Sequence, residues 1–104
     1  MNSNDYNKLV RDNIPKIMQE NGQEPIIEIL NDDRYKEELD KKLLEEVNEY
    51  LKEGTNERLG DIVEVVLALL KYEDSNLGEL IEIMDEKREE KGGFNQKIFL
   101  KGVK

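Results

Sequence analysis

Two acidic residues stand at the start of a segment that is otherwise almost wholly apolar. Asp61 begins the segment, Glu64 follows two apolar residues later, and the segment then continues as Val65-Val-Leu-Ala-Leu-Leu70. A helix that is apolar on nearly all sides is expected to be buried. An ionised carboxylate removed from water costs several kcal/mol unless a positive charge compensates it. These two residues therefore predict a cation beside this segment.

Two acidic stripes are predicted, one on each of two consecutive helices. At about 100° per residue, they comprise Glu46, Glu49 and Glu53 on the first helix and Glu57, Asp61 and Glu64 on the second. If the helices pack antiparallel, the stripes can face each other. Like charges about 4 Å apart repel by about 4 kcal/mol at an effective dielectric of 20. A bound divalent cation would turn that repulsion into ligation.

A solvated acidic surface is the alternative interpretation of these stripes. Acidic residues make up 25 of the 104 positions, so neighbouring glutamates on a helix, such as Glu45 and Glu46, are often only a solvated face. The apolar surroundings of Asp61 and Glu64 favour the cation instead.

The residue types that are absent limit the chemistry further. The chain has no histidine and no cysteine, and its only aliphatic hydroxyls are Ser3, Thr55 and Ser75. A serine hydrolase, a thiol nucleophile and a zinc cluster are therefore excluded. Ligands that are all oxygen favour hard ions such as Mg²⁺, Mn²⁺ or Ca²⁺.

The charge and hydropathy of the chain exclude several kinds of partner. A net charge of −9 argues against nucleic acid, which needs a basic surface. The longest uninterrupted apolar run, residues 65–70, is far shorter than the ~20 residues of a membrane span. The polar N-terminus shows no signal-peptide pattern, so we expect a cytoplasmic protein. An anionic small molecule remains compatible if a divalent cation bridges it to the protein.

The length predicts one domain, residues 1–104. The hydrophobic fraction of 37% is low, so we expect a small core to which a second copy of the chain would add buried area. Helices are expected at about 12–21, 32–53, 57–72 and 77–91, and short strands at 25–30 and 94–100. The short connection at Gly54 predicts that the second and third helices are antiparallel neighbours.

Three sequence blocks, in order, resemble a known superfamily. Glu45-Glu46-Val-Asn-Glu49, followed by Glu57-Arg-Leu-Gly-Asp61, resembles the metal-binding pattern of the all-α nucleoside triphosphate pyrophosphohydrolases, which include the MazG proteins. The flanking blocks at 6–15 and 87–94 are similar to the phosphoribosyl-ATP pyrophosphohydrolase-like branch of that superfamily. The resemblance covers nearly the whole chain.

The resemblance implies an all-α, MazG-like fold: a four-helix antiparallel bundle with two short peripheral strands that forms a homodimer or higher homo-oligomer. It also implies a Mg²⁺-dependent enzyme, with Mn²⁺ as an alternative ion, that cleaves a nucleoside triphosphate to monophosphate and pyrophosphate. Glu46, Glu49 and Asp61 would be the metal ligands. Arg58 stands where the second motif should begin with an acidic residue.

Arg58 leaves three alternatives open. Either Glu57 or Glu64 substitutes as a ligand, or one metal position is weakened, or the protein is a non-catalytic helical dimer that binds a nucleotide or another protein. The substrate is also open: it is either a phosphoribosyl-ATP-like molecule or a non-standard nucleoside triphosphate, and the second is at least as well supported because the branch only resembles the biosynthetic enzyme.

Further roles follow if the chain is such an enzyme. Glu45 or Glu49 would accept a proton from the attacking water. The candidate phosphate- and substrate-binding residues are Lys8, Arg11, Asp12, Lys87, Arg88 and Gly93. Asp12 is equally well explained as a helix N-cap, and residues 87–93 as an ordinary helix C-terminus.

Overall fold

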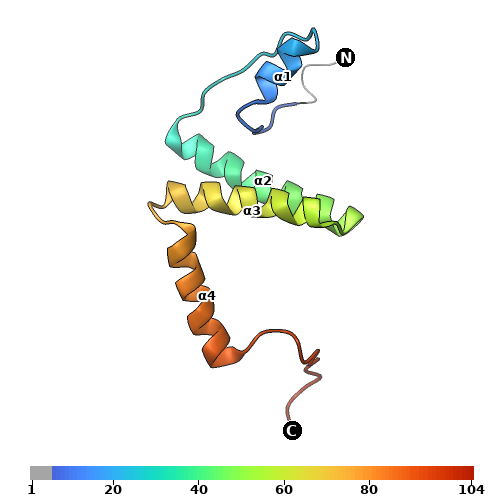
Figure 1. The fold of residues 1–104 in the computed structure, drawn as a ribbon, viewed down its shortest axis with the longest axis vertical. Helices are drawn as coiled ribbons and strands as arrows, with labels where there is room; N and C mark the ends of the chain where they lie inside the picture. The colour runs from blue at the N-terminus through green and yellow to red at the C-terminus, as the bar shows by residue number, and fades with distance from the viewer. Residues whose placement is uncertain (1–5) are drawn as a thin grey trace.

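The chain is built from helices and extended connections. A computed structural model describes residues 6–104. Its helices are α1 (Ile14–Glu20), α2 (Asp32–Glu53), α3 (Asn56–Tyr72) and α4 (Leu77–Lys91) (Figure 1). The predicted all-α class is thus confirmed. Across residues 6–104, no helix combines the length and the apolar character that crossing a bilayer requires.

The centre of the molecule is a hairpin of α2 and α3. The Asn31 side chain caps α2 by accepting a 2.9 Å hydrogen bond from the Arg34 N–H. Gly54 ends α2 at a φ of +65°, a left-handed conformation that glycine adopts without steric cost. The Thr55 hydroxyl then caps α3 by accepting a 3.2 Å hydrogen bond from the Arg58 N–H. The two helices consequently lie side by side (Figure 1).

The bounds of α1 and α4 depend on their own local signals. The N-cap of α1 is Asn13, so the expected role of Asp12 as the N-cap is wrong. Pro15 lies in the first turn, where a missing N–H is tolerated. Asn76 caps α4 by accepting a 3.0 Å hydrogen bond from the Glu79 N–H, and Gly92 follows its last residue, so α4 spans the range expected from the sequence.

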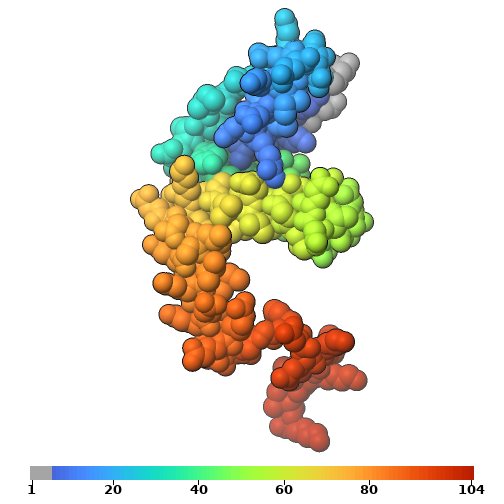
Figure 2. Space-filling model, viewed as in Figure 1, coloured from blue at the N-terminus to red at the C-terminus, as the bar shows by residue number. Residues whose placement is uncertain are grey.

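The apolar core of the described chain is small. Leu39 on α2 and Val65 on α3 are 2% and 7% exposed, whereas Leu44 and Leu51 on α2 are mostly exposed. Figure 2 shows α4 and the C-terminal segment projecting from the hairpin as an arm. Because only α2 and α3 pack extensively within residues 6–104, closure of four helices into one bundle stays a prediction.

The two predicted strands are not formed within residues 6–104. Residues 25–30 are extended but have no strand partner. In the second predicted strand, residues 94–100, the Lys97 N–H donates a 3.2 Å hydrogen bond to the Phe94 carbonyl. Lys97 has a φ of +59°, so residues 94–97 form a turn. A single extended segment has no stability of its own without a neighbouring strand.

Candidate functional site

The acidic stripes of α2 and α3 meet near the Gly54 end of the hairpin, and Arg58 lies between them. Its guanidinium is 2.8 Å from the Glu53 carboxylate and 4.0 Å from that of Glu49, both on α2. It is also 3.5 Å from the Asp61 carboxylate on its own helix. Arg58 therefore contacts carboxylates of both helices and is their counter-charge, while the predicted convergence of these carboxylates on one ion stays a prediction.

Glu46 is the buried member of this acidic group. It is 9% exposed, and one of its oxygens, Oε1, lies 3.3 Å from the Lys42 ammonium. The other oxygen, Oε2, is buried and has no hydrogen-bond partner in the structure. A buried carboxylate oxygen without a partner is energetically costly, and it is the feature of this site that a bound cation would relieve.

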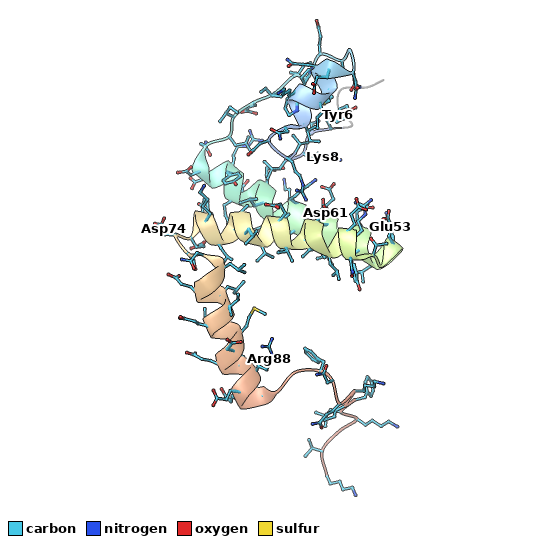
Figure 3. The ribbon with its side chains drawn as sticks, viewed as in Figure 1. Tyr6, Lys8, Glu53, Asp61, Asp74 and Arg88 are labelled. Atoms are coloured by element: carbon cyan, nitrogen blue, oxygen red, sulfur yellow. The ribbon has the colours of Figure 1, made fainter. Side chains whose placement is uncertain are left out.

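The segment before α1 brings two cations to the same place. Arg11 donates a 2.8 Å hydrogen bond from Nη2 to Asp61, and its Nη1 is 3.8 Å from Glu64. The Lys8 ammonium lies 3.6 Å from Glu45. Figure 3 shows the segment that carries Lys8 beside the hairpin that carries Asp61. Two predicted phosphate-binding residues thus contact the predicted metal and catalytic carboxylates.

The remaining predicted site residues lie elsewhere or at the margin. Lys87 and Arg88 are exposed on α4, and Arg88 pairs with Asp85 at 3.2 Å, well apart from Asp61 (Figure 3). Gly93 borders a separate depression of about 270 Å³ beyond α4. The exposed residues at the margin are Asp12, Glu57 and Glu64. Within one chain, the acidic site therefore does not include the α4 residues.

The donor chemistry of the acidic site fits a hard divalent cation. All its candidate ligands are carboxylate oxygens, and the Glu46 Oε2 atom is buried without a partner. In the arrangement described for residues 6–104, no three acidic side chains are close enough together to hold one ion, and Asp61 is paired with Arg11 and Arg58. Ligation by Glu46, Glu49 and Asp61 would require these flexible guanidinium groups to move aside.

Electrostatics within the site centre on the pair formed by Glu53 and Arg58. The hydrogen bond from the Arg58 guanidinium lowers the pKa of the Glu53 carboxyl below its ordinary value. The same hydrogen bond raises the pKa of Arg58, which stays protonated throughout the pH range in which proteins are folded. Arg58 is therefore a permanent positive charge in the acidic site.

The structure adds two features that sequence reasoning missed. Lys42 contacts both Glu45 and Glu46, at 3.4 and 3.3 Å, and its spacing of four residues before Glu46 was the available signal. Tyr35 and Tyr72 meet edge to face, with ring centroids 6.3 Å apart. They line a shallow depression of about 520 Å³ at the other end of the hairpin.

Comparisons with protein-family models, curated proteins and solved structures found no match to this chain. The resemblance to the all-α pyrophosphohydrolases consequently rests on the three sequence blocks alone.

Proposed function

We propose that this protein is a Mg²⁺-dependent nucleotide pyrophosphohydrolase that releases pyrophosphate and a nucleoside monophosphate. One observation carries the proposal: carboxylates of α2 and α3 converge with Arg11, which hydrogen-bonds to Asp61 at 2.8 Å, and with Lys8. A triphosphate needs such a combination, because its oxygens bind both cationic side chains and a metal that carboxylates hold.

In this proposal, different carboxylates bind the metal and accept the proton of the attacking water. Glu46, Glu49 and Asp61 would hold the ion, and Glu57 or Glu64 is available at the edge of the site. A Mg²⁺ ion supplies charge neutralisation and lowers the pKa of a bound water. Glu45, which is half-buried, accepts the proton of the attacking water, with Glu49 as the alternative acceptor.

The two proposed phosphate-binding residues, Arg11 and Lys8, are paired with carboxylates in the structure. In the structure, Arg11 and Lys8 neutralise Asp61 and Glu45. If Asp61 held a metal, Arg11 would become available to substrate oxygens and is suited to bidentate contacts, and Lys8 would bind a phosphate oxygen beside Glu45. Mn²⁺ would support the same chemistry, since it also prefers oxygen ligands.

The substrate class is a nucleotide, either a phosphoribosyl-ATP-like molecule or a non-standard nucleoside triphosphate. The test is incubation with Mg²⁺ and a panel of both classes, followed by identification of the products. Monophosphate with pyrophosphate supports the proposal. Diphosphate with orthophosphate points to other chemistry, and a chain that turns over nothing on the panel is not this enzyme.

Asp61→Ala is expected to abolish turnover, because Asp61 would hold the metal, and to leave the helix content unchanged, because Asp61 is not one of the buried core residues. Activity and circular dichroism are measured together. The matched control is Asp85→Ala on α4, which removes an exposed carboxylate paired with Arg88 and should leave turnover unchanged. Equal activity in both variants would remove Asp61 from the site.

A second candidate function is supported by Arg58. Its ion pairs with Glu49, Glu53 and Asp61 neutralise the acidic stripes without a metal, as expected for a non-catalytic module that binds a nucleotide or a protein. Titration calorimetry with Mg²⁺ separates the candidates: the enzyme binds the ion in the absence of substrate, whereas the module does not.

A further inference from the structure

Two extended segments of the chain expose apolar side chains almost completely. In residues 25–30, Ile26 is 91% exposed and Ile29 is 88% exposed. In residues 98–103, Phe99 is 85% exposed and Val103 is 93% exposed. Neither segment makes a backbone hydrogen bond to another part of residues 6–104. Leu30, at the end of the first segment, is half-buried. The other apolar side chains of both segments are largely exposed, and the backbone donors and acceptors of both segments lack protein partners in the described part of the chain.

The side-chain patterns of the two segments are complementary. Alternate residues of a strand share a face, so one face of the first segment carries Ile26, Glu28 and Leu30. The corresponding face of the second segment carries Phe99, Lys101 and Val103. On each face a charged residue lies between two apolar residues, and the two charged residues, Glu28 and Lys101, have opposite signs. Pairing in either direction brings the charges together and matches apolar residues on both sides.

The charges that surround each segment reinforce this match. Residues 21–33 contain four acidic side chains, Glu24, Glu28, Asp32 and Asp33, and no lysine or arginine. Residues 92–104 contain three lysines, Lys97, Lys101 and Lys104, and no acidic side chain. Like segments repel each other while unlike segments attract, which selects the mixed pair.

The two segments cannot meet within the chain as it is folded. Residues 25–30 connect α1 to α2 on one side of the hairpin, and residues 98–103 follow α4 on the opposite side (Figure 1). A second copy removes this restriction. In a two-fold dimer each copy would offer one segment of each kind, so the same contact forms twice.

We propose that residues 25–30 of one copy pair as a β-ladder with residues 98–103 of a second copy, with Glu28 opposite Lys101. Glu28 lies 3.3 Å from Arg34 in its own chain, but both side chains are more than half exposed, and such a pair is weak. Gly102 and the proline at position 25 stand near the segment ends, where they disturb a ladder least.

Cysteine cross-linking tests this pairing directly, because the chain has no cysteine of its own. Leu100 lies opposite Ile29 in an antiparallel ladder and opposite Ile27 in a parallel one. Leu100→Cys chains are mixed with isotope-labelled Ile29→Cys or Ile27→Cys chains, treated with a short bis-maleimide and analysed by mass spectrometry. We expect a product that contains one labelled and one unlabelled chain, at the expense of products with two identical chains.

A cysteine outside both segments provides the matched control for this cross-linking. Ile17→Cys on α1 is a half-exposed apolar position outside both segments and should not cross-link to Leu100→Cys above background. The proposal would be overturned if Leu100→Cys cross-linked to Ile27→Cys and to Ile29→Cys no more efficiently than to this control. Efficient cross-linking within single chains of the double variants at high dilution would also overturn it, since the two segments would then meet in one copy.

Charge substitution provides an independent measurement. Lys101→Glu should weaken self-association by about tenfold in analytical ultracentrifugation, whereas Lys104→Glu, which makes the same change in charge at the end of the segment and away from Glu28, should have little effect. In a Glu28→Gln background, Lys101→Glu should lose most of its effect. Equal effects of the two lysine substitutions would contradict the placement of Lys101. Because no activity is measured, these results stand apart from those for the pyrophosphohydrolase.

Discussion

At the scale of single residues, Arg58 decides how the acidic site behaves. It occupies a position where the resembled motif carries an acidic residue, and its guanidinium contacts Glu49, Glu53 and Asp61. A positive charge at this place lowers the repulsion among carboxylates, and it competes with any metal for the same oxygens. The sequence alone showed the substitution, but only the structure showed that one side chain reaches both helices.

Arg58→Glu is expected to tighten Mg²⁺ binding by about tenfold, because it removes the competing cation and adds a carboxylate beside Glu49 and Asp61. Titration calorimetry at fixed ionic strength measures the change. Arg34→Glu makes the same charge change at the start of α2, away from the acidic stripes, and should leave the affinity unaltered. An equal gain in both variants would show a general charge effect instead of a local one.

The pH dependence of the Glu53–Arg58 pair follows from the direction in which the Glu53 pKa is shifted. Arg58 lowers the pKa of Glu53 below its ordinary value of 4.5. The pair therefore stabilises the folded state above the unfolded pKa, and this contribution is lost as the pH falls through the folded pKa.

Carbon NMR titration should show the Glu53 pKa rising toward 4.5 in Arg58→Gln. The difference in unfolding free energy between the wild type and this variant should shrink as the pH falls below 4.5. An unchanged Glu53 pKa in Arg58→Gln would mean that the hydrogen bond seen in the structure does not persist in solution.

At the scale of elements, the turn at Gly54 sets which carboxylates meet. Gly54 has a φ of +65°, and the next residue, Thr55, already caps α3. So short a connection fixes the register of α2 against α3 and thereby brings Glu49 and Glu53 opposite Arg58. These signals, together with Asn31 and Asn76, were sufficient to predict three of the four helices closely from sequence.

Gly54→Ala should lower the free energy of unfolding by about 1 kcal/mol, because an alanine at positive φ is strained. Gly60→Ala is its matched control, since Gly60 lies inside α3 and an added Cβ would meet no atom within 4 Å. It should raise the free energy by roughly 0.5–1 kcal/mol. Urea denaturation of both variants gives the comparison, and an unchanged or raised stability in Gly54→Ala would contradict the assignment of Gly54 to the left-handed region.

At the scale of the whole molecule, the single chain is extended. Its radius of gyration is 18.2 Å, whereas a compact domain of about 100 residues has a radius near 13 Å. Leu39 and Val65 are its buried hydrophobic residues within the described chain, and α4 exposes about half of Ile81 and Met84. So little burial does not offset the conformational entropy of folding, and we propose on this ground that folding is coupled to association.

Stability should accordingly depend on protein concentration. For a two-state dimer, a tenfold dilution lowers the apparent free energy of unfolding by about 1.4 kcal/mol, because dilution favours the separated, unfolded chains. Urea midpoints measured over a hundredfold range of concentration provide the test. Midpoints that do not move with concentration would show that one chain folds stably on its own.

The sequence by itself determined the helices and the chemical character of the site. Capping residues, glycines and apolar spacing act over a few neighbouring positions, so α2, α3 and α4 could be predicted from local signals, and the lack of histidine and cysteine left only oxygen ligands. Tertiary structure decided what the acidic stripes contact. Arg11 is 50 positions away from Asp61, and no local pattern predicts that their side chains meet. It also decided that the predicted strands stay unpaired, because a strand depends on a partner that lies outside its own segment.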